Sequence, residues 1–539
     1  MKPMSFDFHS RRSMVVARRG MVATSNPLAS QAGLAILRQG GNAADAAIAA
    51  AAVLNVTEPA STGIGGDCFA LYFDAKTKRI TALNGSGRAP AALNLGDLAK
   101  QGYTSVPEHS PHAVTVPGAV AGWHDLLQRH GSMTMKDVLG DAIHYASEGY
   151  PAHPVFAASW GATESLLRQS SNAGDYLPNG HAPGAGQVVQ LPQLANTLRQ
   201  IAEGGPQAFY TGQVANAIVS TLQSLGGVMS LDDLKNHTST WGDAISTNYR
   251  GIDVYEHPPN GQGLAALLAL NIASGWELGG LSWDSPDRLH LMVEAMRLAF
   301  ADARHYIADM AVTSVPAPEL LDPNYAARRR QMVSPNQAML PPSYGMPFGG
   351  SNTVYLTAVD GQGNACSFIN SLFHGWGSGI VAEGTGVFLQ NRGSGFSLDP
   401  SHPNALAGGK RPYHTIIPGI ALKDGELWCT FGVMGGFMQP QGHFQVISAM
   451  IDDQLNPQEA LNRPRFCLEE GTSSSVLALE EGIPVSAMAR LAELGHRIRP
   501  VSGRGRGVFG DGQIIRRDSE TDVLLGGSDP RKDGLVAAF

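Results

Sequence analysis

Cysteine is scarce in this sequence and forms no motif. The 539 residues include four cysteines, and none of them stands in a CxxC pair. Three of the four lie among apolar or strand-like residues, so we expect buried free thiols and no disulfide framework. The cysteines are Cys68, Cys366, Cys429 and Cys467.

Long apolar runs and blocks of like charge are also missing. The longest apolar run, 46–54, is far shorter than the ~20 residues of a membrane helix. Residues 1–20 lack the continuous apolar stretch of a signal peptide. Charged residues make up 16% and the net charge is −8, with no basic stripe. These absences predict a cytoplasmic protein with neither nucleic acid nor membrane as a partner.

Several familiar catalytic motifs are absent. The seventeen histidines form no HExxH and no recognisable ligand spacing, so we expect no metal and no other cofactor. No G-x-S-x-G elbow is present, which argues against a serine α/β-hydrolase. The glycine-rich stretches 375–379 and 503–507 lack the context of a Rossmann or P-loop motif, so turns explain them better.

The residues that are present predict mixed helices and strands. Hydrophobic residues at 43% and 64 glycines indicate a well-buried, loop-rich enzyme. Asn26-Pro27 and Asn42 are typical of helix starts, and 286–306 has clear helical periodicity. Strand-like stretches occur at 69–73, 79–83, 354–359, 365–369, 386–389, 416–422 and 427–431, and further helical patterns at 444–452 and 485–494.

A turn-rich segment, 331–352, precedes the strand-like run that begins after Thr353. It has the composition of an interdomain linker or of a processing loop. If the chain is cut before Thr353, the hydroxyl and the freed α-amine lie on one residue, which supplies nucleophile and base together. Threonine is also common in strands because its branched Cβ suits a pleated surface. The position alone therefore leaves both interpretations open.

Two other places could bind an anion. Gly435-Gly436 directly follows a predicted strand and could offer backbone N–H groups to an oxyanion, although by itself the pair is better explained by a β-turn. Arg88 is a lone cation in a loop of small residues. It could hold a carboxylate bidentately or be an ordinary surface arginine.

Taken together and in order, these pieces resemble the γ-glutamyltransferase (γ-glutamyl transpeptidase) superfamily over nearly the whole chain. The resemblance implies an α+β, N-terminal-nucleophile (Ntn) hydrolase fold, an αββα sandwich of two stacked sheets between helical layers. It also implies a precursor that cuts itself before a catalytic threonine. The stretches that carry it are 41–47, 63–66, 116–122, 258–263, 293–302, the Thr353 junction, 410–412, 435–436 and 528–531.

By this resemblance Thr353 is the nucleophile and the cleavage site lies between Asn352 and Thr353. The large subunit would be 1–352, with 331–352 as its processing segment, and the small catalytic subunit 353–539, together one composite domain. The remaining matches are Gly435 and Gly436 to the oxyanion glycines, Arg88 to the arginine that holds a substrate carboxylate, and Asn370 to an asparagine that contacts the glutamyl group.

The departures from the family pattern concern the acyl pocket. Gly395 stands where the family has the aspartate that binds the glutamyl ammonium, and Arg392 stands where it has glutamine. His414 and Thr415 replace paired serines, and the lid segment 397–409 is short. Losing a carboxylate and gaining a guanidinium nearby disfavours an acyl group that carries an ammonium. The variant pattern looks like the branch that includes cephalosporin/glutaryl acylases and oxamate amidohydrolases.

We therefore expect an autoprocessing amidohydrolase that acts on a small carboxylate-bearing amide, either oxamate-like or glutaryl. Arg392, His414 and Thr415 would join Arg88 and Asn370 in binding the substrate. The partners would be the two subunits of one precursor, with a dimer of heterodimers as a further option. One alternative is a γ-glutamyl hydrolase or transferase acting on glutathione. The other is an inactive homologue kept as a binding or structural protein.

Overall fold

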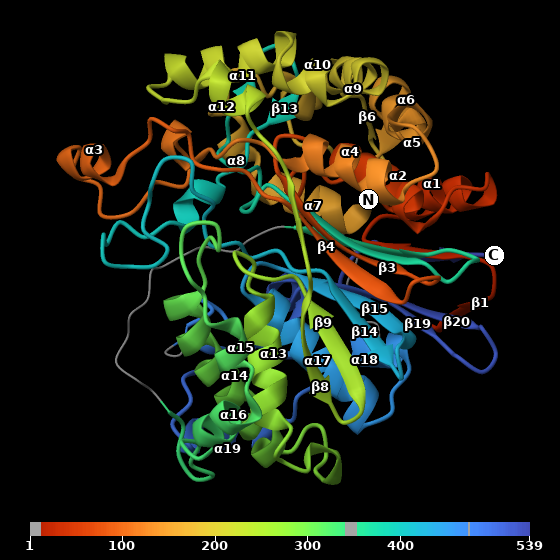
Figure 1. Cartoon of the computed structure of the whole chain (residues 1–539), viewed down its shortest axis with the longest axis vertical. Coiled ribbons are helices and arrows are strands. Elements are labelled where there is room, and N and C mark those ends of the chain that lie inside the picture. Colours follow the sequence, from red (N-terminus) through yellow and green to blue (C-terminus); the bar gives the residue numbers. More distant parts are fainter. Residues whose placement is uncertain (1–11, 340–352, 473–474) are drawn as a thin grey trace.

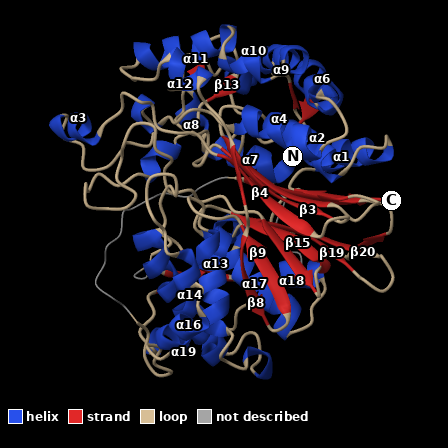
Figure 2. Ribbon diagram, in the orientation of Figure 1, coloured by secondary structure: helices blue, strands red, loops and turns tan. Residues whose placement is uncertain are grey.

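The computed structural model describes residues 12–339, 353–472 and 475–539 of the chain (Figure 1). Two seven-stranded sheets lie face to face between two helical layers (Figure 2). This arrangement confirms the predicted α+β αββα sandwich. Apolar side chains from both sheets, among them Leu71, Phe73, Ile420 and Ile515, fill the space between them.

Each sheet combines strands from the chain before Thr353 with strands from the chain after it. The first runs in the order β1 (Val15–Ala17), β20 (Leu524–Ser528), β19 (Asp511–Arg517), β15 (Glu426–Met434), β14 (Gly419–Lys423), β9 (Ile252–Glu256) and β8 (Ile245–Tyr249). The second runs β21 (Leu535–Ala538), β2 (Met21–Thr24), β10 (Val354–Val359), β11 (Ala365–Ser371), β3 (Asp67–Asp74), β4 (Arg79–Gly85) and β7 (Thr240–Gly242). Neither segment could complete a sheet by itself.

The helical layer over the second sheet comes from the chain before β7 (Figure 1). Its innermost helix, α2 (Ala43–Thr57), is buried along its whole length. Alanines there let it lie close against β10 and β11, and Asn42 with Asp45 forms a capping box at its start. Other helices of the layer are α1 (Pro27–Arg38), α4 (Ala119–His130), α6 (Gly140–Glu148), α7 (Pro154–Ala162), α9 (Pro192–Gly204), α10 (Pro206–Tyr210) and α11 (Gln213–Ser224).

The opposite layer covers the first sheet and is drawn from both segments (Figure 1). Its members are α13 (Gly263–Ala273), α14 (Pro286–Tyr306), α15 (Ala317–Leu320), α16 (Pro323–Arg330), α17 (Met438–Asp452), α18 (Pro457–Asn462) and α19 (Val485–Glu493). A small sheet of β16 (Phe466–Leu468), β17 (Leu477–Glu480) and β18 (Ile498–Val501) adjoins it.

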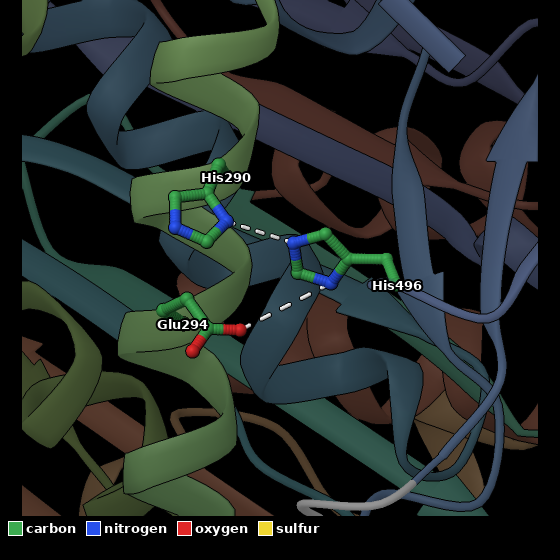
Figure 3. Close-up of side chains that lie close together, drawn as sticks. All are labelled: His290, Glu294 and His496. Carbon is green, nitrogen blue, oxygen red and sulfur yellow. Dashed lines mark hydrogen bonds and ion pairs between the residues drawn. The ribbon is translucent and has the colours of Figure 1, made fainter. Parts of the chain in front are cut away.

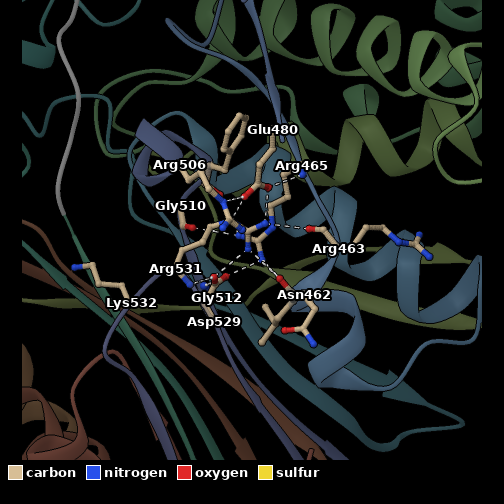
Figure 4. A network of polar contacts seen from close by, with 12 residues as sticks. Asn462, Arg463, Arg465, Glu480, Arg506, Gly510, Gly512, Asp529, Arg531 and Lys532 are labelled. Carbon is tan, nitrogen blue, oxygen red and sulfur yellow. Dashed lines mark hydrogen bonds and ion pairs between the residues drawn. The ribbon is translucent and has the colours of Figure 1, made fainter. Parts of the chain in front are cut away.

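A buried ionic network ties the C-terminal strands to this small sheet (Figure 4). The guanidinium of Arg531 pairs with Glu480 and with Asp529, and Asp529 also accepts from Arg465 Nη2 at 2.8 Å. Arg506 Nε reaches Glu480 Oε1 at 2.6 Å. Because these charges are paired and hydrogen-bonded, they can remain ionised in the interior.

All four cysteines are buried and free, as predicted from their spacing. Among the described helices, none combines the length and the apolar character that crossing a bilayer would require.

Candidate active site

Thr353 lies at the entry to β10, in the middle of the second sheet and out of contact with solvent. Strand β10 pairs antiparallel with β11, with Val354 opposite Asn370. Extending that register by one residue places Ser371 opposite Thr353. The two hydroxyl oxygens are 3.1 Å apart, within hydrogen-bond distance. The fold therefore holds a second hydroxyl beside the predicted nucleophile.

Arg392 brings a positive charge to these hydroxyls. Its Nη2 donates to Ser371 Oγ at 3.3 Å and its Nη1 to Thr415 Oγ1 at 2.8 Å. The guanidinium is fully buried, 4.0 Å from the ring centre of Phe373, in a cation–π arrangement. Burial lowers the pKa of Arg392 to about 9, opposed by Asp67. The side chain thus remains a cation at neutral pH.

Asp67 is the acceptor around which the neighbouring loops gather. Its Oδ1 accepts from the N–H groups of Gly87 and Gly118 and from Gln390 Nε2, at 2.9, 3.3 and 2.8 Å. Its Oδ2 lies 3.0 Å from His414 Nε2. Burial raises the pKa of Asp67, and Arg392 and the hydrogen bonds from Gln390 and Gly87 oppose that rise. So many donors on one carboxyl group suit its ionised form.

His414 is hydrogen-bonded to the Asp67 carboxylate. Its Nδ1 accepts from the Ile416 N–H at 3.3 Å, so Nε2 carries the proton that is donated to Asp67. Burial, Arg392 and other cations hold the pKa of His414 well below its usual value. With both ring nitrogens engaged, His414 orients Asp67 and has no nitrogen left for a substrate.

Gly435 and Gly436 form the sharp turn between β15 and α17, with φ angles of 123° and 59°. Their carbonyls are fixed, because Gly435 O accepts from Met438 N and Gly436 O accepts from Gln439 N and Gln262 Nε2. Since N–H and C=O point in opposite directions across a trans peptide, the Gly436 N–H points away from α17. Met434, just before the turn, shares an apolar cluster with Tyr355 of β10. The turn therefore adjoins the strand that Thr353 begins.

Arg88 is half-buried, and its guanidinium shares a hydrogen-bond acceptor with a second arginine. Arg88 Nη1 donates to Thr238 O at 3.2 Å, and Arg411 Nη2 donates to the same carbonyl at 3.3 Å. Burial and the charge of Arg88 lower the pKa of Arg411 to about 10. Two cations held side by side form a place where a carboxylate would relieve their repulsion.

Three predicted site residues are joined by hydrogen bonds: Thr353 to Arg392 through Ser371, and Arg392 directly to Thr415. His414 is hydrogen-bonded to Asp67, whose charge acts on Arg392. Asn370 points elsewhere: its Oδ1 accepts from Trp123 Nε1 at 3.0 Å and its Nδ2 donates to Gly63 O at 3.3 Å. Its contact with substrate stays a prediction. Asn352, the other half of the predicted cleavage site, lies outside the described residues.

Sequence reasoning missed Ser371, Asp67 and Arg411. Ser371 could have been found, because a hairpin between the strands 354–359 and 365–371 sets residue 371 opposite residue 353. Asp67 follows a glycine-rich loop and carries no motif of its own. Its hydrogen-bond partners Gly87, Gly118, Gln390 and His414 come from four separate stretches of chain, which only the fold brings together. Among the described residues, the one group with a metal-binding composition is His290, Glu294 and His496, away from these contacts.

Comparison with known proteins finds matches along nearly the whole chain. A family model described as gamma-glutamyltranspeptidase matches residues 29–539. The chain is 37% identical over 529 residues to the glutathione hydrolase-like YwrD proenzyme of Bacillus subtilis (strain 168), with 97% of this chain and 99% of that protein covered. It is 34% identical over 538 residues to the oxamate amidohydrolase proenzyme of Klebsiella pneumoniae, with the same coverage. The crystal structure of cephalosporin acylase from Bacillus halodurans matches with a TM-score of 0.93 at 45% identity, covering 100% of this chain and 99% of that one.

Proposed function

Because the chain belongs to the gamma-glutamyltranspeptidase family of Ntn hydrolases and acylases, we propose that it cleaves the amide bond of a small carboxylate-bearing substrate. Thr353 is the proposed nucleophile, and the acyl group is oxamate-like or glutaryl. The names of two relatives, oxamate amidohydrolase and cephalosporin acylase, support this substrate class.

The observation that carries the proposal is the position of Arg392. Its guanidinium is one hydroxyl away from Thr353, through Ser371 at 3.3 and 3.1 Å. An acyl group with an ammonium would place a second cation in this buried site, a mismatch worth several kcal/mol, on the order of the 3–5 kcal/mol for an uncompensated buried charge. An acyl group that is neutral or anionic here avoids that repulsion.

The first chemical stage is self-cleavage. Thr353 Oγ attacks the carbonyl carbon of residue 352, the peptide C–N bond breaks, and water hydrolyses the resulting ester. The products are the proposed large subunit, 1–352, and the proposed small subunit, 353–539. As the C–N bond breaks, the proton of the Thr353 hydroxyl passes to the released nitrogen, which becomes the new α-amine of Thr353. This amine has a reference pKa of about 7.7–8.0.

The second stage is turnover. The α-amine takes the proton of Thr353 Oγ as the oxygen attacks the amide carbon. N–H groups of Gly435 and Gly436 stabilise the oxyanion, and Arg88 with Arg411 holds a carboxylate. The leaving amine departs with a proton, and water then frees the acid from Thr353. Ser371 donates to or accepts from Thr353 Oγ1 throughout and keeps its rotamer fixed.

Hydrolysis of γ-glutamyl compounds such as glutathione is the second candidate, since one relative is named as glutathione hydrolase-like. Gly395 weighs against it, because no carboxylate is available there for the glutamyl ammonium. A side chain at Gly395 would be tight, as an added Cβ would lie 3.1 Å from Tyr413 O. Release of p-nitroaniline from γ-glutamyl-p-nitroanilide at a rate comparable to the other amides would favour this candidate.

The decisive experiment compares intact masses of purified wild type, Thr353→Ala and Thr353→Ser. We expect two fragments for wild type, the smaller beginning at Thr353, and one uncut chain for Thr353→Ala. The serine variant keeps a hydroxyl and should still be cut, more slowly. A single uncut wild-type chain would contradict the proposal and favour an inactive homologue. The processed enzyme is then assayed with oxamate, a glutaryl anilide and the γ-glutamyl anilide in parallel.

A further inference from the structure

A second polar cluster lies in the helical layer that covers the first sheet. His290 and Glu294 are one turn apart on α14, and His496 enters from the loop between α19 and β18 (Figure 3). Their exposed fractions are 1%, 0% and 4%. The cluster plays no part in the chemistry proposed for Thr353, although such buried ionisable groups usually need a partner.

The hydrogen bonds fix the tautomers of both rings. His290 Nε2 is 2.7 Å from Ser334 O, and a carbonyl can only accept, so Nε2 carries the proton. His290 Nδ1 therefore has a lone pair and accepts from His496 Nε2, which is 2.8 Å away. When the His496 ring is neutral, its Nδ1 also has a lone pair, and this nitrogen faces Glu294.

His496 and Glu294 face each other without forming a hydrogen bond. With the ring neutral and the carboxyl group ionised, His496 Nδ1 and Glu294 Oε1 are both acceptors, and they lie 4.0 Å apart. Within the described ranges neither atom has a hydrogen-bond partner. Glu294 Oε2 accepts from Met339 N at 2.8 Å, and Arg297 Nε is 3.3 Å from Oε1 without hydrogen-bond geometry. Two buried acceptors that face each other call for a cation or a rearranged proton.

The donor set is one that a transition-metal ion prefers. Two neutral imidazoles and a carboxylate are typical Zn²⁺ ligands, and the three ligand atoms lie within 4.8 Å of one another. A ligating histidine usually donates its other N–H to a carbonyl, as His290 does to Ser334.

We propose that His290 Nδ1, His496 Nε2 and the Glu294 carboxylate bind one divalent transition-metal ion, Zn²⁺ in the first instance. The proton now on His496 Nε2 moves to Nδ1, which leaves the Nε2 lone pair free for the ion. The two imidazoles separate slightly to admit the ion. Arg297 opposes the site with its charge and should limit the affinity.

The location gives this ion a structural role. His290 and Glu294 belong to the chain before Thr353, and His496 belongs to the chain after it. His290 is hydrogen-bonded to Ser334 and Glu294 to Met339. These two partners lie near the end of the described stretch that precedes residue 340. If the chain is cut at Thr353 as proposed, the ion would cross-link the two subunits. Binding itself does not depend on that cut.

The test uses full-length protein freed of metal with a chelator and titrated with Co²⁺ and with Zn²⁺. We expect one equivalent to bind, a visible Co²⁺ absorption that Zn²⁺ displaces, and a higher melting temperature with metal. His496→Gln should weaken binding by more than ~100-fold, beyond the 10–100-fold typical of outer-shell losses. His305→Gln is the matched control, an exposed histidine on the same helix, and should bind like wild type.

Glu294→Gln, which keeps the side-chain shape, serves as a second variant if His496→Gln does not fold. It should change the Co²⁺ spectrum and weaken binding. The proposal is overturned if wild type binds no stoichiometric metal. Equal binding by wild type, both cluster variants and the His305 control would overturn it as well. Uncut Thr353→Ala protein repeats the titration, so a failure of self-cleavage cannot be mistaken for a failure of metal binding.

Discussion

Ser371 is the residue whose contact with Thr353 is most direct. Its hydroxyl accepts from Phe373 N at 2.8 Å, which fixes it in place beside Thr353 Oγ1. We predict that Ser371→Ala lowers kcat by ~10–100-fold with little change in KM, because the loss falls on the oriented nucleophile. Ser371→Thr keeps the hydroxyl and should retain most of the activity. Steady-state kinetics on the best amide decide it, and a change confined to KM would contradict the assignment.

Arg392 spans two hydroxyls with one planar group, which a lysine cannot reproduce. Both Arg392→Lys and Arg392→Met should therefore lose activity toward the carboxylate-bearing amide, by ~10-fold or more. If the positive charge of Arg392 also excludes ammonium-bearing acyl groups, Arg392→Met should reduce the enzyme's preference for the carboxylate-bearing amide over γ-glutamyl-p-nitroanilide. The ratio of kcat/KM for the two substrates is the measurement. An unchanged ratio would mean that Arg392 only packs against Phe373.

The pH profile separates the proposed base from His414. We expect kcat/KM to rise with pH as the α-amine of Thr353 loses its proton, with a midpoint near ~7.7–8.0. His414 is neutral across this range because burial holds its pKa well below the usual value. His414→Gln should thus lower activity but leave the midpoint in place. A midpoint that moved with this substitution would assign the base to His414.

The same residues show what could be inferred from the sequence. Family resemblance singled out Arg392 and Thr415 together, and the structure joins them at 2.8 Å. It could not reveal that Arg392 reaches Ser371, since that contact depends on how the 392–395 turn meets the end of β11. Nor could it reveal Asp67, whose donors meet only after both sheets have formed.

At the scale of elements, the predicted helix 286–306 is confirmed residue for residue as α14. The helix predicted at 444–452 begins earlier, at Met438. Pro440 and Gly442 are poor helix formers, but proline is tolerated in a first helical turn. Gly442 lies against Val433, where an added Cβ would be 2.5 Å from Val433 Cβ. Close packing on β15 therefore decides this helix, and local propensity does not.

The turn between β15 and α17 depends on Gly435. Its φ of 123° disfavours any side chain, and an added Cβ would be 3.1 Å from Gly510 Cα. We predict that Gly435→Ala lowers kcat on the order of 10²-fold by displacing the oxyanion donors. Gly161→Ala is the control, because a Cβ there, inside α7, meets open space. Kinetics and melting curves of both variants are compared, and equal activities would remove Gly435 from the oxyanion site.

At the scale of the whole molecule, the network around Glu480 should make stability depend on pH. Burial alone would raise the pKa of Glu480, but Arg531 and Arg506 outweigh it and lower the pKa below its usual value. A depressed carboxyl pKa stabilises the fold above the unfolded value and loses that contribution as pH falls through the folded value.

Glu480→Gln should accordingly destabilise the protein at pH 7 by about 3–5 kcal/mol, since it leaves Arg531 and Arg506 short of a charge. The difference from wild type should shrink in acid, below the unfolded pKa of a glutamate, ~4.3. Urea unfolding in the uncut Thr353→Ala background measures both. Glu493→Gln, on an exposed pair at the end of α19, is the control and should change little. A difference that is the same at both pH values would contradict the ionic origin.

The interleaving of the two segments within both sheets has a consequence for assembly. Strand β10 has β2 on one side and β11 on the other, while β14 lies between β9 and β15. Fragments 1–352 and 353–539, made separately, would each expose bare strand edges and their part of the apolar clusters that the two segments share. Mixing two such preparations should give aggregates and not active enzyme. We therefore expect active enzyme to form only by folding of a single polypeptide, and its two fragments not to exchange between molecules.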